Sequence, residues 1–183
     1  MRLSEILSTD DPLLDFNLRL LLDSFPPEER RDESAWRRLT ASEPTFHNTT
    51  VIDDAENPVG MLTYWDFPEG AVYIEHFATL PRLRGSGIGS AALRRLIADV
   101  GQRPILLEVE MPDDEISRRR IGFYRREGFG LLDIDYIQPP YRRGGTGVEM
   151  RLMLRGRLPE GVSAADLATT LAEIVYHRPL RDF

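Results

Sequence analysis

Apolar residues in the first 40 positions recur mostly at helical spacing. The stretch 11–24 carries seven large apolar side chains and stops before a Pro-Pro pair, which predicts an amphipathic helix. The prolines begin a polar bend, after which Ser34 is placed to cap a shorter helix that carries Trp36 and Leu39. Two helices are therefore expected before the first clear strand.

From Thr45 onward the chain becomes rich in β-branched and aromatic residues, and the spacing changes to alternation. Residues 49–52 and 59–65 predict a hairpin around a turn at 53–58, and residues 71–80 predict a central strand. The remaining predicted elements are a helix over 91–100 ended by Gly101, a strand over 104–110, a helix over 113–127 closed by Gly128, a strand toward Ile137, a loop over 138–147, a strand over 148–154 and a capped helix over 163–176. This order predicts an α+β fold of mixed layers.

Composition narrows the classes of protein that fit this pattern. The 183 residues are enough for one good core, so a single domain over 1–183 is expected. The formal net charge of -7 disfavours nucleic acid as a partner. Every basic residue is arginine, which excludes a Schiff-base lysine and a P-loop lysine, and the lack of cysteine excludes disulfides and an acyl-cysteine intermediate.

The sequence shows no pattern typical of a signal peptide, a membrane span or a metal site. The first residues lack the apolar run of a signal peptide, and no later stretch approaches the roughly 20 apolar residues of a membrane span. We therefore expect a cytoplasmic protein without a membrane partner. His47, His76 and His177 are far apart and lack metal-binding spacing, so no metal is expected.

A glycine-rich turn lies between the central strand and the helix that follows it. Residues 84–90 read Arg-Gly-Ser-Gly-Ile-Gly-Ser, and backbone N–H groups at such a turn can hold an anion together with the helix dipole. The third glycine of a dinucleotide fingerprint is replaced by Ser90, and the lysine of a P-loop is missing. The two interpretations left are a phosphate site and a tight turn without a ligand.

Two motifs together resemble the GNAT family of N-acetyltransferases. The first is Arg84-x-x-Gly87-x-Gly89 after a strand, and the second is Leu107-Glu-Val followed by a helix that carries Phe-Tyr-Arg-Arg-Glu-Gly-Phe over 123–129. The resemblance implies a splayed, mostly antiparallel sheet flanked by helices, with a core at about 45–155. The predicted helix near the C-terminus would form an extension at about 160–183 outside that core. The resemblance also implies acetyl-CoA as cosubstrate and direct transfer of the acyl group to a primary amine.

The resemblance assigns residues to the cosubstrate and to the chemistry. Tyr124 matches the tyrosine that protonates the departing thiolate, while Glu75 and Glu108 match two alternative positions of the general base. The expected contacts of acetyl-CoA are Phe77, Ala78, Thr79, Leu80, Arg84, Gly85, Ser86, Gly87, Ile88, Gly89, Ser90, Arg120, Phe123 and Tyr124. Tyr124 could instead be a core aromatic, and the arginines at 118–120 could form a solvated helix face.

The acceptor is left open between a small molecule and a peptide amine. Its expected contacts are Tyr73, Glu110, Tyr136, Gln138 and Tyr141. The carboxylates of Glu108 and Glu110 could also bind a cationic acceptor or pair with the helix arginines. A different class of function, an idle acyl-CoA sensor or interaction module on the same fold, is the alternative. Whether the chain forms a homodimer stays open as well.

Overall fold

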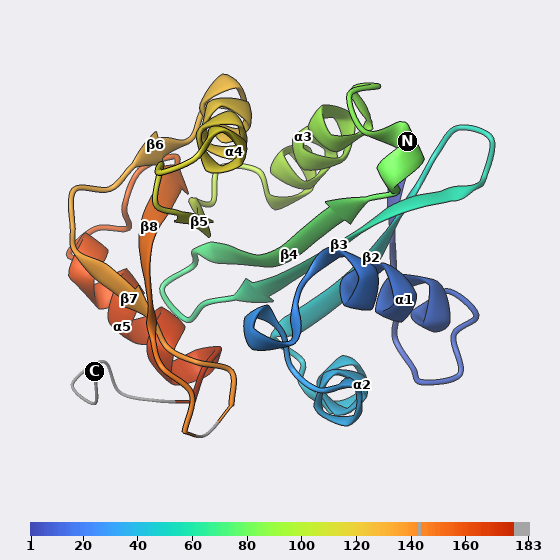
Figure 1. Cartoon of the computed structure of the whole chain (residues 1–183), viewed down its shortest axis with the longest axis horizontal. Coiled ribbons are helices and arrows are strands. Elements are labelled where there is room, and N and C mark those ends of the chain that lie inside the picture. The colour runs from blue at the N-terminus through green and yellow to red at the C-terminus, as the bar shows by residue number, and fades with distance from the viewer. Residues whose placement is uncertain (143, 178–183) are drawn as a thin grey trace. The chain divides into compact units, whose positions relative to one another are not determined.

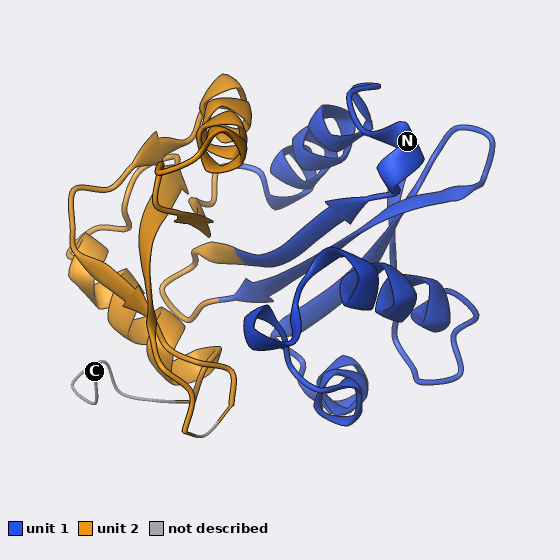
Figure 2. Ribbon diagram, in the orientation of Figure 1, with its two compact units in different colours: residues 1–66, 74–101 blue, residues 67–73, 102–183 orange. Residues whose placement is uncertain are grey.

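The computed structural model describes residues 1–142 and 144–177, which contain five α-helices and eight β-strands (Figure 1). The chain forms two compact units (Figure 2). Unit 1 comprises Met1–Asp66 and Ile74–Gly101, and unit 2 comprises Phe67–Tyr73 and the chain from Gln102 onward. The predicted α+β class is confirmed.

Unit 1 is built on antiparallel strands. Strand β1 (Arg2–Glu5) pairs with β2 (Phe46–Ile52), and β2 pairs with β3 (Pro58–Asp66). The β2–β3 turn is held by Asp53, whose carboxylate accepts hydrogen bonds from the N–H groups of Ala55 and Asn57, both at 2.9 Å. Most of β4 (Val72–Thr79) lies beside β3 in this unit. The predicted hairpin and central strand are thus confirmed.

Helices cover both faces of the unit 1 strands (Figure 1). On one face, Asn17 of α1 (Leu14–Ser24) donates to Asn48 and accepts from Thr50, each at 2.8 Å. On the other face, Ala92 of α3 (Ile88–Val100) packs with Val51 and Val59. Thr50 and Val51 point to opposite faces because side chains alternate along a strand. The remaining helices of the unit are α2 (Glu33–Ser42) and the 3-10 turns Pro27–Glu29 and Pro81–Leu83.

Unit 2 is organised around β8 (Val148–Arg155). It pairs antiparallel with β5 (Ile105–Glu110) and with two short strands, β6 (Gly130–Leu131) and β7 (Tyr136–Gln138). The first residue of β4, Val72, donates its N–H to the carbonyl of Pro104 at 2.8 Å. Two helices complete the unit, α4 (Glu115–Arg126) and the predicted C-terminal helix α5 (Ala164–Ile174), which begins with a capping box of Ser163 and Asp166.

The structure differs from the sequence-based predictions at three places: one strand was missed and two predictions were wrong. Strand β1 was not predicted, because Arg-Leu-Ser-Glu is too short to show a period. The predicted strand toward Ile137 is divided into β6 and β7, and the break contains two exposed aspartates, which strands disfavour. Helix α2 is capped by Asp32, which accepts from the N–H of Ala35 at 2.8 Å, whereas the predicted cap, Ser34, donates its hydroxyl to Asp32 at 2.7 Å.

None of the helices in the described part of the chain is both long and apolar enough to cross a membrane. The part of the predicted C-terminal extension beyond residue 177 lies outside the described residues.

Candidate functional site

The glycine-rich turn of unit 1 leaves its backbone open. Gly85 and Gly87 have φ angles of 79° and 87°, a left-handed conformation that glycine adopts without steric cost. No atom lies within 4 Å of the position that a Cβ would take at either residue. The turn therefore presents bare backbone that a ligand can approach closely.

Helix α3 begins directly after this turn. Gly87 is its N-cap residue and supplies no side-chain cap, and the first turn carries no acidic residue. The N–H groups of Ile88, Gly89 and Ser90 have no acceptor within the helix, because they precede its first full turn. Arg84 is exposed at the start of the same segment. Unpaired N–H groups, a helix dipole and a nearby guanidinium suit an anion such as a pyrophosphate.

The end of β4 holds the residues expected to contact pantetheine. Phe77 packs against the core cluster of Val51, Val59 and Ala92. The N–H of Leu80 donates to the carbonyl of Val59 at 3.0 Å, and its carbonyl accepts from the N–H of Leu83 at 2.9 Å. A further hydrogen bond at Leu80 would therefore use the second lone pair of that carbonyl. Ala78 is buried, and Thr79 is partly buried.

Tyr124 lies on α4 in unit 2, between the rings of Phe123 and Phe129, whose centroids are 5.1 and 5.6 Å away. Burial raises the pKa of Tyr124 to about 12, so the phenol carries its proton throughout the neutral range. Its hydroxyl makes no hydrogen bond with any residue that the structure describes. The proton is thus available for donation.

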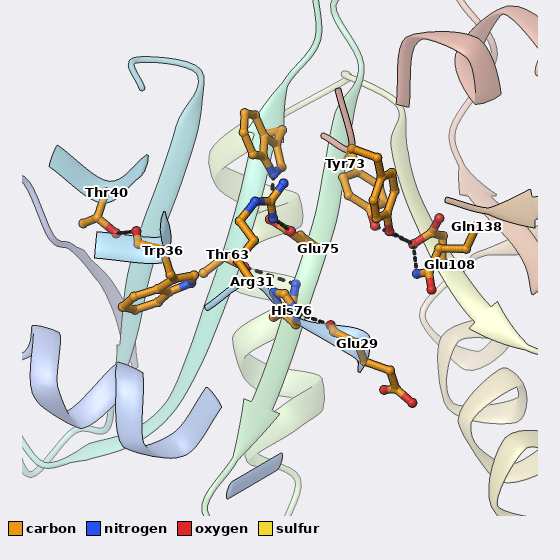
Figure 3. A network of polar contacts seen from close by, with 12 residues as sticks. Glu29, Arg31, Trp36, Thr40, Thr63, Tyr73, Glu75, His76, Glu108 and Gln138 are labelled. Carbon is orange, nitrogen blue, oxygen red and sulfur yellow. Dashed lines mark hydrogen bonds and ion pairs between the residues drawn. The ribbon is translucent and has the colours of Figure 1, made fainter. Parts of the chain in front are cut away.

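The carboxylate of Glu108, on β5, is surrounded by neutral donors. Oε2 accepts hydrogen bonds from Tyr73 and Gln138, each at 2.7 Å (Figure 3). It also accepts one from Tyr176 at 2.8 Å. Oε1 accepts one from Tyr136. We call Tyr73, Tyr136 and Tyr176 the tyrosine cluster. Four of the residues predicted for catalysis or acceptor binding meet here, at Glu108.

The tyrosine cluster is buried, whereas Glu108 and Gln138 stay partly exposed. Burial first, and then the negative charge of Glu108, raise the pKa of all three tyrosines well above the usual value. Their hydroxyls therefore remain protonated donors. The ring of Tyr141 packs on Tyr176 with centroids 4.9 Å apart, which brings a further predicted residue next to the cluster.

Tyr176 was not among the residues predicted for the site. It follows the C-terminal helix and lies 68 residues from Glu108 in sequence. The one feature of the sequence that could have indicated it is the residue type, since a buried tyrosine hydroxyl needs a hydrogen-bond partner.

Glu75 has a different environment, in unit 1. Its carboxylate accepts a hydrogen bond from Trp65 at 2.7 Å and forms an ion pair with Arg31, whose guanidinium carbon lies 5.5 Å from the Trp65 ring centroid. The side chain of Glu75 is fully buried. Both carboxylate oxygens are thus engaged by residues that the sequence analysis did not identify.

His76, the neighbour of Glu75, is a buried core residue. Its Nε2 contacts the carbonyl of Glu29 at 3.0 Å (Figure 3), and its ring meets Phe25 edge-on at 4.6 Å. Burial lowers the pKa of His76 to about 3, so its imidazole is neutral at physiological pH.

The arginines of α4 have local partners. Arg120 forms an ion pair with Glu110, and Arg118 donates to the carbonyls of Pro112 and Asp113 at 2.9 and 3.1 Å. Arg119 lies 3.8 Å from Glu115 in an exposed pair. Glu110, predicted to bind the acceptor, is therefore neutralised by Arg120 in this structure.

Comparison with known proteins identifies the family and the fold of the chain. The model of the acetyltransferase (GNAT) family matches residues 11–129 of the 183. A protein from Bacteroides thetaiotaomicron described as a member of the GNAT family of acetyltransferases is 42% identical, with a TM-score of 0.89 over 97% of this chain and 99% of that one. The comparison with curated proteins found no match.

Two more distant structures share the fold. An aminoglycoside 6'-N-acetyltransferase in complex with coenzyme A is 17% identical, with a TM-score of 0.59 over 85% of this chain and 96% of that one. A variant of the spermidine N-acetyltransferase from Vibrio cholerae is 12% identical, with a TM-score of 0.63 over 85% of this chain and 94% of that one. With a family match over more than half of its length and a relative at 42% identity, the chain belongs to the GNAT family of acetyltransferases.

Proposed function

We propose that this acetyltransferase moves the acetyl group of acetyl-CoA to a primary amine by direct attack of the amine on the thioester. The observation that carries the proposal is the open, uncapped start of α3, where bare backbone N–H groups follow two left-handed glycines. The coenzyme A bound to the aminoglycoside acetyltransferase supports the choice of anion. The residues that would hold the pyrophosphate are Arg84, Gly85, Ser86, Gly87, Ile88, Gly89 and Ser90.

When bound, acetyl-CoA supplies a thioester whose C–S bond breaks as the C–N bond to the amine forms. Tyr124 donates its phenolic proton to the departing sulfur, and its raised pKa keeps that proton in place until the step occurs. The amine must reach the thioester as neutral R–NH2, so a carboxylate takes one proton from R–NH3⁺. The nitrogen loses a second proton when the amide forms, and that proton replaces the one that Tyr124 gave to sulfur. The absence of cysteine leaves direct transfer as the economical route.

We assign that carboxylate to Glu108 rather than Glu75. The oxygens of Glu75 already bind Arg31 and Trp65, and the side chain is fully buried. Glu108 has only neutral partners and keeps partial exposure, so an incoming amine can reach it. Thr79 and Leu80, at the end of β4, are the candidates for backbone contact with the pantetheine arm.

Binding and turnover test the proposal separately. CoA at about 100 times its dissociation constant should stabilise the protein by about 2.7 kcal/mol. Release of CoA thiol from acetyl-CoA should then depend on an added primary amine. Binding without turnover across a panel of amines would favour an acyl-CoA sensor, and no thermal shift at saturating CoA would overturn the proposed site.

A matched pair of glycine variants isolates the turn. Gly87→Ala adds a Cβ where the phosphate would approach, while Gly70→Ala adds one to a loop glycine with nearly the same φ, 85° against 87°. Both positions have open space around the added carbon, so neither variant creates a clash. Because the φ angles are nearly equal, the backbone strain of the two variants is similar. We expect the Gly87 variant alone to bind CoA about tenfold more weakly. Equal CoA affinity in the two variants would contradict the assignment.

A further inference from the structure

Glu108 differs from the two other candidate carboxylates in the charge of its partners. Glu75 pairs with Arg31, and Glu110 pairs with Arg120. Among the described residues, Glu108 has no ion pair, and its four hydrogen-bond donors are all neutral. The negative charge of such a half-buried carboxylate is compensated by no described cation, and a cationic ligand would supply the missing partner.

The two oxygens of Glu108 are unequally occupied. A carboxylate offers about four acceptor sites, two on each oxygen. Oε2 receives three donors and is crowded, whereas Oε1 receives only Tyr136 from the described residues and keeps one site. The side chain of Gln138 is partly exposed, so among the crowded donors it is the most readily displaced.

The tyrosine cluster adds acceptors around this carboxylate. Each hydroxyl has one hydrogen, which it donates to Glu108, and two lone pairs, which that bond leaves in place. A primary ammonium group has three N–H donors. Three phenolic oxygens and the remaining site on Oε1 can therefore satisfy an R–NH3⁺ group, whereas an R–N(CH3)3⁺ group has no hydrogen to offer them.

The rings suit the rest of such a ligand. Phe67 stacks on Tyr73 with centroids 6.0 Å apart, and Tyr141 packs on Tyr176. Aromatic rings beside the carboxylate would favour contact with an alkyl chain, and the single carboxylate matches a ligand with one positive charge.

We propose that Glu108 and the tyrosine cluster recognise a primary ammonium group, and that the acceptor enters as a compact alkylammonium monocation. Tyr176, supplied by the C-terminal extension, is then a residue of the acceptor site. This inference rests on the proposed function in naming the ammonium ligand as the acceptor. The matched family segment ends at residue 129, so the extension that supplies Tyr176 lies beyond it.

Titration calorimetry of the full chain with three probes of similar shape tests the recognition. The probes are butylammonium, butyltrimethylammonium and butan-1-ol, each titrated with and without saturating CoA. We expect butylammonium to bind at least about tenfold more tightly than either of the others, because only it offers both charge and N–H donors. Equal affinity for the two cations, or no binding of butylammonium in either state, would overturn the inference.

Single substitutions test which residues produce the preference for butylammonium. Glu108→Gln and Tyr176→Phe should each weaken butylammonium binding about tenfold or more, and Tyr176→Phe should raise the KM for the amine while the KM for acetyl-CoA stays unchanged. The control is Tyr64→Phe, because Tyr64 is a partly exposed tyrosine of unit 1 that stacks on His47. It should change neither butylammonium binding nor the KM for the amine. Unchanged amine affinity in both variants, with wild-type melting temperatures, would refute the inference.

The two proposals fail in different ways. If the protein binds butylammonium selectively but shows no CoA binding, the proposed transfer fails and the ammonium site stands. If CoA binds and thiol release proceeds equally with primary amines whether or not Glu108 and Tyr176 are intact, acetyl transfer stands, but the ammonium site and the assignment of Glu108 as base both fail.

Discussion

Buried tyrosines of unit 2 occupy two kinds of environment. Tyr73, Tyr136 and Tyr176 donate to a carboxylate, which satisfies their hydroxyls. Tyr124 is surrounded by aromatic rings, and the structure shows no hydrogen bond from its hydroxyl to any described residue. The hydroxyl is thus satisfied by a carboxylate at three of these tyrosines, whereas at Tyr124 it is the group that we propose as the proton donor.

Removal of the Tyr124 hydroxyl should affect chemistry and leave binding intact. We expect Tyr124→Phe to lower kcat about 100-fold, within the usual range for a lost general acid, with the affinity for CoA unchanged. Steady-state rates of thiol release and a CoA titration provide the measurement. Tyr64→Phe serves as control, and equal kcat in wild type and the Tyr124 variant would remove this hydroxyl from the mechanism.

His76 should make the protein sensitive to acid. In the folded state its pKa is about 3, against 6.5 for an ordinary histidine, so between these values the unfolded chain binds the proton and the folded one does not. The free energy of unfolding therefore falls as pH drops below 6.5, by about 1.4 kcal/mol per pH unit from this residue. Urea melts at pH 7, 6 and 5 should show a shallower decline for His76→Gln. Parallel declines in the two proteins would contradict this.

At the scale of elements, the sequence was sufficient where a glycine ends a helix. Gly101 ends α3 with a φ of 67°, and Gly128 follows α4 with a φ of 92°, both at the predicted positions. Short strands such as β1 and β6 carry no comparable signal, because pairing with a long neighbour determines them.

A close approach of two strands in unit 1 gives a prediction at this scale. A Cβ added at Gly60 of β3 would lie 2.7 Å from the carbonyl oxygen of Ala78 on β4. Because that oxygen belongs to the backbone, one strand must shift, and we expect Gly60→Ala to lower the free energy of unfolding by about 1–3 kcal/mol. Gly130→Ala, on β6 with no atom within 4 Å, is the matched control and should stay within about 0.5 kcal/mol. Similar urea midpoints for both variants would refute the clash.

At the scale of the whole molecule, the site was predicted only in part. Glu108, Tyr136 and Gln138 were named from motif and loop, yet their meeting at one carboxylate depends on tertiary structure. Residue periodicity describes one element at a time, so it cannot place Tyr176 beside a strand 68 positions earlier. The pairing of Glu75 with Arg31, 44 positions away, was missed for the same reason.

Net charge should influence the reaction with a cationic acceptor. The chain carries a formal charge of -7, which attracts an alkylammonium ion and repels anionic acetyl-CoA over distances that salt screens. We expect kcat/KM for butylammonium to fall roughly tenfold between about 10 mM and 1 M potassium chloride. The kcat/KM for acetyl-CoA, measured at saturating amine, should fall less or rise.

Sucrose at matched osmolality controls for solvent effects, since it leaves electrostatic screening nearly unchanged. In Glu108→Gln the salt dependence for butylammonium should be weaker than in wild type, because the nearest negative charge is gone. If kcat/KM for the amine stays constant or rises with salt, the acceptor does not bind as a cation attracted by this protein. The role of Glu108 would then be to orient a neutral group.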